Sequence, residues 1–284
     1  MNIGENSMKY KAVALDLDGT LLGSDLKIRP EVAAAIRATR AAGLHVIMVT
    51  GRHHTAALPY HRELGLDTPL MCCNGTYAWD VLSQTAQSPR PLTKSQAHQT
   101  LALVRKHDVH ALMYADAAMT YETIEPHLRR LLHWADSVSS DSRPLIEQVL
   151  RFDHRIEDAT YVWKFALTSP DLDRLRHFGN SVEQELGLSC EWSARDRVDV
   201  AQRGNSKGRL LTEWLQQQGI SPQEVIAFGD SPNDLSMLQA VGLGVAMSHS
   251  KDIVQAAAAL VTGSNDSPSI ATVLQQHVLG ALSV

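Results

Sequence analysis

The beginning of the sequence alternates short apolar runs with helix-like segments, and this pattern restricts the fold more than any other feature. The runs YKAVALDL (Tyr10–Leu17) and LHVIMVT (Leu44–Thr50) are typical of buried parallel strands. Between them, Pro30 occupies a first helical position, and helical spacing continues to Gly43, a common C-terminal cap. A strand, a helix and a second strand within about 40 residues predict a right-handed βαβ unit and therefore a parallel sheet.

The pattern continues beyond this unit and then changes. A helix is expected from about His53 to Leu64, then a strand in PLMCC, and Asn74-Gly75 predicts a type I′ hairpin turn. The segment SQTAQSPRPLTKSQ is polar and contains prolines, as is typical of a linker. Beyond it, paired strands adjoin without crossover helices, which indicates an α+β unit with an antiparallel sheet. Its expected helices span 94–107, 126–134 and 171–186, and its expected strands 111–114, 119–121, 161–167 and 189–192.

The parallel pattern resumes after about Asp196. Helices are expected at 205–218, 232–240 and from 268, and strands at 225–230, 245–247 and 259–262. One parallel-sheet domain is therefore interrupted by an inserted second domain. We predict an α/β fold in which residues 1–85 and 193–284 form a Rossmann-like, doubly wound parallel-sheet core, and residues 86–192 form an inserted α+β domain.

The composition narrows the functional class. A chain of 284 residues, 44% of them apolar, can bury a core, and its three Cys cannot form a disulfide framework. The net charge of −5 lacks the basic excess of a nucleic-acid binder. The sequence contains no run of about 18 apolar residues to span a membrane. Its first residues, MNIGENSM, lack the blocks of a signal peptide. We expect a cytoplasmic monomer or homodimer, with residues 1–7 as a frayed extension before Met8.

Two aspartates follow the first predicted strand, in the sequence Asp16-Leu17-Asp18-Gly19-Thr20. Open α/β sheets bind ligands at the carboxyl ends of their strands. Alternate residues of a strand point the same way, so both carboxylates can enter that crevice. Gly19 allows the chain to turn away sharply. A single aspartate here would be explained as a turn or capping residue, but that explanation does not account for the pair.

A second acidic cluster, GDSPND (229–234), ends another predicted strand. Helix capping explains one of its acids and leaves Asp234 in the first helical turn. Gathering both acidic pairs around one crevice costs on the order of 4 kcal/mol for each two carboxylates about 4 Å apart, at an effective dielectric of about 20. A bound cation relieves this repulsion, and oxygen ligands in an open crevice favour Mg²⁺ over zinc.

Two further segments are suited to phosphate. Thr50-Gly51-Arg52 ends the second strand and begins a helix, where a hydroxyl and free backbone N–H groups bind anions. Lys207, in GNSKG (204–208), lies in the first turn of another helix. A lone lysine is usually a solvated surface residue, but the dipole of a helix disfavours a cation at its N-terminus. Lys207 therefore predicts an anion close to its ammonium group.

These four segments, in this order, resemble the motifs of the haloacid dehalogenase (HAD) superfamily of phosphotransferring hydrolases. DLDGT is similar to the first motif, Thr50 to the second, Lys207 to the third and GDSPND to the fourth. The insert between the second and third motifs is similar to the cap of the Cof-type group (class IIB), which implies that residues 86–192 cover the active site. Asp18 implies a phosphohydrolase, since dehalogenases lack this second acid.

The resemblance implies a role for each motif residue. Asp16 would be the nucleophile that forms an aspartyl-phosphate, and Asp18 the general acid and base. Mg²⁺ would bind the carboxylates of Asp16 and Asp230 and the backbone carbonyl of Asp18. Asp234 would orient Lys207 or a metal-bound water. The phosphoryl oxygens would be bound by Thr50, Lys207, Asn233 and the N–H groups of Leu17 and Gly51.

Longer segments resemble the Cof-type pyridoxal phosphate phosphatases of enteric bacteria: TGRHH, LDTPLMCCNGTY, VWKFALT, HFGNSVEQELGLSCEWS and GNSKG. This implies a Mg²⁺-dependent phosphatase for a small phosphorylated metabolite, with pyridoxal 5′-phosphate as the first expectation. The alternatives are a broad sugar phosphatase (acting, for example, on fructose 1,6-bisphosphate), a phosphomutase, and a non-catalytic regulatory module. A regulatory module would be expected to have lost Asp16, Asp18 or Asp230, and all three are present.

Several residues outside the motifs are candidates for the substrate pocket. Arg52 follows the second motif, and Asn74 lies at the tip of the predicted hairpin. His53 and His54 could line the mouth of the crevice, but the simpler interpretation makes them residues of a first helical turn. Cys72-Cys73 are best explained as small buried side chains.

The strand predicted over residues 161–167 adds a further candidate. Alternation places one face of this strand toward the cap helices and turns Lys164 toward the crevice. The alternative interpretation is that Lys164 is an ordinary solvated lysine. The first face would hold Tyr161, Trp163, Phe165 and Leu167. Tyr114 and Trp192 are candidates to stack on a pyridine ring.

Overall fold

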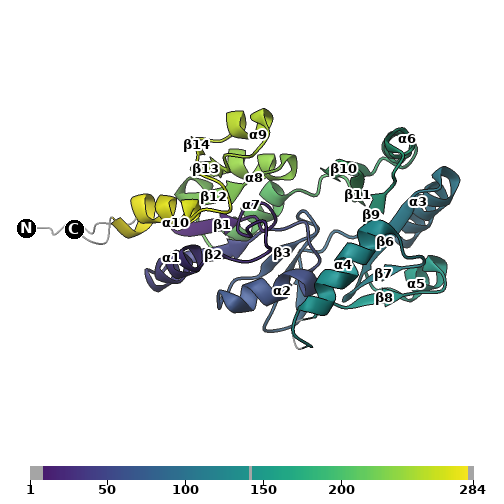
Figure 1. Cartoon of the computed structure of the whole chain (residues 1–284), viewed down its shortest axis with the longest axis horizontal. Helices are drawn as coiled ribbons and strands as arrows, with labels where there is room; N and C mark the ends of the chain where they lie inside the picture. Colours follow the sequence, from purple (N-terminus) through teal and green to yellow (C-terminus); the bar gives the residue numbers. More distant parts are fainter. Residues whose placement is uncertain (1–8, 141–142, 281–284) are drawn as a thin grey trace, which may run out of the picture.

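The computed structural model describes residues 9–140 and 143–280, so the predicted N-terminal extension lies outside the described residues. The chain folds into a parallel-sheet core and an inserted cap that lie beside each other (Figure 1). The predicted fold class, a doubly wound α/β core interrupted by an α+β insert, is confirmed. Within the described ranges, no helix has the length and apolar character needed to cross a membrane.

The core is built on a five-stranded parallel sheet with the order β14-β13-β12-β1-β2. Because β1 pairs with both β2 and β12, segments far apart in the sequence end at neighbouring positions on one edge. The strands are β1 (Ala12–Leu15), β2 (His45–Met48), β12 (Val225–Gly229), β13 (Leu243–Ala246) and β14 (Leu260–Val261).

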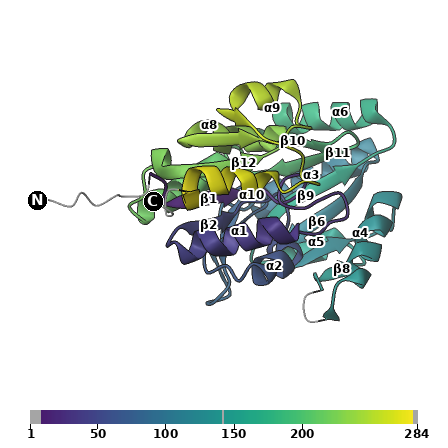
Figure 2. The ribbon, with the colours of Figure 1, turned by 60° about the vertical axis from the view of Figure 1, so that its left-hand side comes forward.

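Helices cover both faces of this sheet, since alternate residues of β1 point to opposite sides. Val13 and Leu15 share a core cluster with α1 (Pro30–Ala41) and α10 (Ser269–Leu274), which lie next to each other in Figure 2. Ala12 and Ala14 pack against α7 and α8 on the opposite face. The other core helices are α2 (His54–Glu63), α7 (Lys207–Gln217), α8 (Leu235–Ala240) and α9 (Asp252–Ala257), with short turns at Pro222–Glu224, Pro232–Asp234 and Gln275–Leu279.

A small antiparallel sheet follows α2, with β3 (Leu70–Cys72), β4 (Tyr77–Asp80) and β5 (Thr85–Gln87). The predicted hairpin is confirmed, and the φ angles of 55° at Asn74 and 84° at Gly75 fit the left-handed turn. A Cβ atom on Gly75 would lie 2.0 Å from the carbonyl oxygen of Ser206, so the absence of a side chain lets the hairpin tip contact the start of α7.

The cap is a six-stranded sheet with the order β10-β11-β9-β6-β7-β8, antiparallel except for the β7–β8 pair. Helices α3, α5 and α6 pack on one face, whereas Leu128 of α4 joins the cluster on the face toward the core. The strands are β6 (His110–Ala115), β7 (Ala118–Tyr121), β8 (Ile146–Gln148), β9 (Val162–Thr168), β10 (Ser189–Ala194) and β11 (Arg197–Ala201). The helices are α3 (Lys94–His107), α4 (Pro126–Ser137), α5 (Phe152–Asp158) and α6 (Leu172–Ser181), the last continuing into a π turn at Val182–Leu186.

The predicted boundaries of the insert need correction at both ends. The polar segment after Thr85 does not begin as a linker, because β5 pairs with β4 of the core. The boundary at residue 192 falls inside β10, and β11 then pairs with β9, so the cap sheet extends to Ala201. Only Val198 and Val200 mark β11 as a strand among polar neighbours, so its sequence resembles a loop.

The predicted alternation is wrong for Trp163 of β9 and for Tyr161 just before it, since both pack in the cluster on the side of the core. Tyr114 pairs with Lys164 but Ala115 pairs with Val162, so a bulge leaves Trp163 without a partner position. Trp163 therefore stacks on Tyr77 of the core hairpin, with 4.0 Å between ring centroids, instead of packing on the cap helices. Beyond the bulge the prediction is confirmed, because Phe165 and Leu167 pack in the cluster beneath those helices and Lys164 faces the crevice.

Candidate active site

Three carboxylates meet where β1 and β12 end. Asp16, Asp230 and Asp234 each offer an oxygen atom within 4.8 Å of the others. Asp16 and Asp234 are buried, and Asp230 is partly buried. Gly19 allows the backbone after β1 to lie this close to Asp230, because it has a φ of 80° and a Cβ atom there would lie 2.6 Å from Oδ2 of Asp230. The adjacent strands of the parallel sheet thus bring the first and fourth motifs together.

Lys207 enters this cluster from the start of α7. Its Nζ lies 2.5 Å from Oδ1 of Asp16 and 2.6 Å from Oδ1 of Asp234, and its side chain is only 1% exposed. Burial alone would lower the pKa of Lys207, but the two carboxylates outweigh it and raise this pKa, so the ammonium stays charged. The structure thus places two carboxylates beside the ammonium of Lys207, and the phosphate that the sequence predicts there stays a prediction.

Asp234 holds this arrangement in place. While Oδ1 accepts a hydrogen bond from Lys207, Oδ2 accepts one from each of the backbone N–H groups of Asp230 and Ser231, both at 3.0 Å. Both of its oxygens are therefore engaged, and its contacts are those of a residue that positions Lys207 and the 230–231 loop.

The charge balance of the cluster favours a cation. Burial, together with the negative charges of Asp234 and Asp230, raises the pKa of Asp16 well above its usual range despite the attraction of Lys207. Burial and Asp234 also raise the pKa of Asp230. One ammonium thus does not neutralise three carboxylates in a low-dielectric site, and oxygen ligands of this kind fit Mg²⁺.

Asp18 faces the crevice but is bound to Arg52. The guanidinium donates from Nε to Oδ2 at 2.8 Å and from Nη2 to Oδ1 at 2.5 Å. Although desolvation in the crevice opposes it, the positive charge of Arg52 lowers the pKa of Asp18, whose side chain is half exposed. Arg52 also lies 4.8 Å from the centre of the Trp134 ring in the cap. Both carboxylate oxygens of Asp18 therefore accept hydrogen bonds from Arg52 in this structure.

Polar residues of the other motifs lie at or near the crevice. Thr50 is fully buried, and its hydroxyl oxygen accepts a hydrogen bond from the N–H of Arg52 at 3.0 Å. Asn233 donates to Oδ1 of Asn74 at 3.1 Å, and Asn74 donates to Glu191 of the cap at 3.5 Å. Leu17 is fully buried, and Gly51 lines the crevice.

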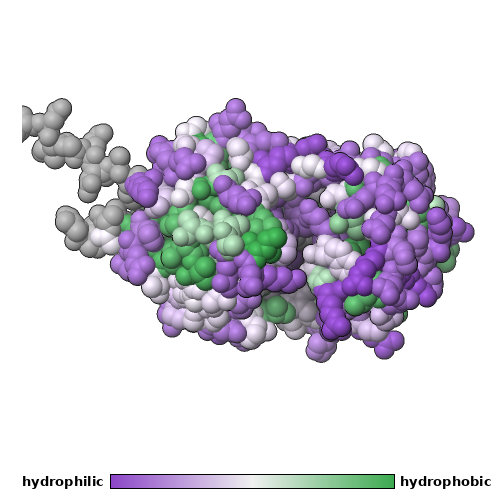
Figure 3. All heavy atoms as spheres, turned by 90° about the horizontal axis from the view of Figure 1, so that it is seen from above, coloured by the Kyte–Doolittle hydropathy of each residue, from purple (hydrophilic) through white to green (hydrophobic). Residues whose placement is uncertain are grey.

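A cavity of about 1160 Å³ lies between the core and the cap, and the surface is visibly hollowed there (Figure 3). Its core side includes Asp16, Asp18 and Arg52, and its cap side includes Tyr114, Lys164 and Trp192. The predicted pocket candidates of the cap therefore lie on the same cavity as the predicted nucleophile. Asn74 is not among the residues that line this cavity. It lies next to the cavity, where it accepts a hydrogen bond from the lining residue Asn233.

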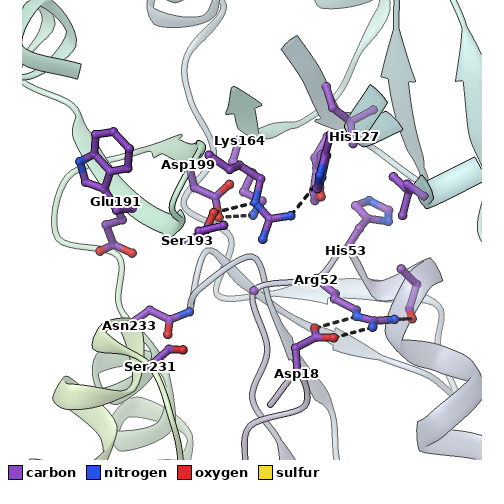
Figure 4. A pocket seen from close by; sticks show the side chains of 18 of the residues that line it. Asp18, Arg52, His53, His127, Lys164, Glu191, Ser193, Asp199, Ser231 and Asn233 are labelled. Atoms are coloured by element: carbon purple, nitrogen blue, oxygen red, sulfur yellow. Dashed lines mark hydrogen bonds and ion pairs between the residues drawn. The ribbon is translucent and has the colours of Figure 1, made fainter. Parts of the chain in front are cut away.

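The sequence did not single out several residues that this cavity brings together. Figure 4 shows His127 and Asp199 on the cap side, near Lys164. Arg197 donates from Nε to the Ser193 hydroxyl at 2.8 Å, and its Nη1 lies 3.2 Å from the His127 ring. The one signal available was the alternation of charged and apolar residues in RVDVA, which is compatible with a short strand but does not indicate that Asp199 is buried.

The two histidines after Arg52 are structural contacts. His53 caps α2 through Nδ1, and its Nε2 lies 3.0 Å from the backbone oxygen of Asp116 in the cap. His54 stacks on Trp79, and burial lowers the pKa of His54 to about 3. Cys72 and Cys73 are buried as expected. Through the contact of its Nε2 with Asp116, His53 links the core to the cap at the edge of the cavity.

Comparison with known proteins agrees with this geometry. Residues 13–274 match the family model of haloacid dehalogenase-like hydrolases. The chain belongs to this family. It is 45% identical over 272 residues to "Pyridoxal phosphate phosphatase YbhA" of Escherichia coli (strain K12), covering 96% of this chain and 100% of that protein. The resemblance found in the sequence is therefore confirmed.

More distant proteins are similar to this hydrolase along most of its length. "5-amino-6-(5-phospho-D-ribitylamino)uracil phosphatase YwtE" of Bacillus subtilis (strain 168) is 26% identical over 288 residues, with 95% of this chain and 99% of that protein covered. The crystal structure of a haloacid dehalogenase-like hydrolase from Bacteroides thetaiotaomicron superposes with a TM-score of 0.83 at 24% identity, covering 94% of this chain and 99% of that one. The latter similarity shows the fold alone.

Proposed function

We propose that this hydrolase is a Mg²⁺-dependent phosphatase that cleaves small phosphomonoesters, and pyridoxal 5′-phosphate in particular, through a phosphorylated Asp16. The observation that carries the proposal is the contact of Lys207 with both Asp16 and Asp234, beside Asp230, at the base of a capped cavity. The name of the relative that is 45% identical supports the substrate.

In the proposed reaction, a carboxylate oxygen of Asp16 attacks phosphorus, the P–O bond to the leaving group breaks, and Asp18 gives that oxygen a proton. Asp18 then takes a proton from a water molecule, which attacks the phosphorus of the aspartyl-phosphate. The P–O bond to Asp16 breaks, inorganic phosphate leaves, and Asp16 is regenerated. Lys207, Thr50, Asn233 and the N–H groups of Leu17 and Gly51 would bind the phosphoryl oxygens.

The proposed Mg²⁺ would be held by the carboxylates of Asp16 and Asp230 and by the backbone carbonyl of Asp18. When bound, it would offset the negative charge that the phosphoryl group brings to this cluster. Asp234 is assigned to positioning, because its two oxygens already accept hydrogen bonds from Lys207 and from the 230–231 loop.

The substrate is tested by the release of inorganic phosphate from pyridoxal 5′-phosphate and from a panel of sugar phosphates, including fructose 1,6-bisphosphate. We expect kcat/KM for pyridoxal 5′-phosphate to be higher by about tenfold or more, which is about 1.4 kcal/mol of transition-state binding. Equal or higher values for sugar phosphates would indicate a broad sugar phosphatase. Isomerisation without phosphate release would indicate a phosphomutase, and no turnover of any substrate would favour a regulatory module.

Removal of divalent metal is expected to abolish phosphate release. With EDTA, the rate should fall by about 10²-fold or more, since three clustered carboxylates repel an incoming phosphate dianion. Excess Mg²⁺ should restore the rate, and EDTA already saturated with Mg²⁺ is the control for chelator binding. A rate unchanged by EDTA, after metal analysis confirms that the protein is metal-free, would refute the assignment.

A further inference from the structure

Asp199 and Lys164 form a buried ion pair on the cap side of the cavity. Asp199 lies in β11, and Lys164 lies in the neighbouring strand β9. Their side chains are 6% and 3% exposed, and Nζ of Lys164 lies 2.7 Å from Oδ2 of Asp199. Figure 4 shows the two side chains together on the wall that faces the motif residues of the core.

The other carboxylate oxygen is unsatisfied. Oδ1 of Asp199 is buried and has no hydrogen-bond partner among the residues that the structure describes. A buried carboxylate oxygen without a donor is costly, and the cost disappears when a ligand supplies an N–H or O–H group. The ammonium of Lys164 also lies 4.7 Å from the centre of the Tyr114 ring, another side chain of the cavity.

The stability of the cap does little to explain why an ion pair is buried at this position. The flanking residues Val198 and Val200 are buried in the apolar cluster of the cap, so β11 is anchored without Asp199. A buried ion pair is often no more stabilising than apolar side chains of similar size. A small void of about 10 Å³ also borders Asp199, Cys73 and Asn205 and could hold one water molecule, and the experiment below separates that role from substrate binding.

We propose that Asp199, oriented by Lys164, determines substrate specificity by accepting a hydrogen bond from the ring N–H of a phosphorylated pyridine. A carboxylate accepts hydrogen bonds and donates none, so its partner must be an N–H or O–H donor. Pyridoxal 5′-phosphate offers a ring nitrogen that carries a proton when a carboxylate faces it. This inference rests on the proposed phosphatase function and adds the residue that distinguishes a pyridine from other leaving groups.

The test compares two substrates and two enzymes. The substrates are pyridoxal 5′-phosphate and its deaza analogue, in which a C–H group replaces the ring nitrogen, and the enzymes are the wild type and Asp199→Asn. The wild type should prefer pyridoxal 5′-phosphate over the analogue by about tenfold or more in kcat/KM, as expected for a hydrogen bond to a charged group. In Asp199→Asn the amide oxygen can still accept a hydrogen bond but carries no charge, so the ratio should fall by about threefold or more.

The controls separate the inference from the function on which it rests. The aryl ester 4-nitrophenyl phosphate has no donor for Asp199, so its hydrolysis by Asp199→Asn should stay close to that of the wild type. Glu191→Gln changes another carboxylate of the same cavity and should keep the substrate ratio of the wild type. No hydrolysis of any ester by the wild type would overturn the phosphatase assignment itself.

Two outcomes would overturn the role of Asp199. One is a ratio in Asp199→Asn that equals that of the wild type. The other is an equal loss of activity toward all three esters, which would indicate a structural role or a bound water. If Asp199→Asn leaves Lys164 unpaired and the protein unfolds, the double variant Lys164→Met/Asp199→Asn removes the buried charge as well. Its substrate ratio should also fall toward unity, with its thermal melting measured beside it.

Discussion

Asp16→Asn is expected to lower kcat for phosphate release by about 10³-fold or more, because an amide cannot form the acyl-phosphate bond on which the proposed reaction depends. The substitution keeps the size of the side chain, and its amide oxygen can still accept a hydrogen bond from Lys207. Burial and the neighbouring carboxylates make a charge at Asp16 unfavourable. The neutral side chain should therefore leave the free energy of unfolding unchanged or slightly higher.

The measurement combines phosphate release at saturating Mg²⁺ with thermal unfolding of the same preparation. Asp67→Asn is the matched control, since its exposed carboxylate lies on the core and pairs with the guanidinium of Arg40, at 3.4 Å. The control should keep the wild-type rate. If Asp16→Asn retained activity near that of the wild type, a different residue would have to be the nucleophile.

The centre of this site could be predicted because the order of parallel strands determines which residues meet. Asp16 follows β1, and Asp230 follows β12, which pairs directly with β1. Their proximity therefore follows from recognising two buried strands, even though more than 200 residues of sequence separate them. Lys207 could be added because a cation at a helix N-terminus implies an anion beside it, and the structure places two carboxylates there.

The cap side of the site could not be predicted in the same way. The direction of Trp163 depends on a bulge opposite Tyr114 and Ala115, and no residue in that segment indicates a bulge. The burial of Asp199 depends on β11 lying between β9 and β10, where strands from two sides cover it. The salt bridge between Asp18 and Arg52 depends on side-chain rotamers. Pairing and rotamers are tertiary properties, which a periodic pattern in the sequence does not determine.

Lys207→Met is expected to affect both activity and stability. The ammonium of Lys207 contacts Asp16 and Asp234, and its loss leaves three carboxylates within 4.8 Å without that positive charge. Removing one partner of a buried ion pair typically costs about 3–5 kcal/mol, and we expect a loss of this size in the metal-free protein. Activity should fall by about 10²-fold or more, because the same ammonium would bind the phosphoryl oxygens.

Magnesium distinguishes this explanation from simple loss of packing. A divalent cation at Asp16 and Asp230 would replace part of the missing positive charge, so added Mg²⁺ should raise the melting temperature of Lys207→Met more than that of the wild type. Lys106→Met, which removes an exposed ammonium 3.8 Å from Glu185, should change the free energy of unfolding by less than about 1 kcal/mol, with or without Mg²⁺. If Mg²⁺ raised the melting temperatures of Lys207→Met and of the wild type equally, lost packing and not repulsion among the carboxylates would explain the lower stability of the variant. Lys207 and Mg²⁺ would then not neutralise the same charges.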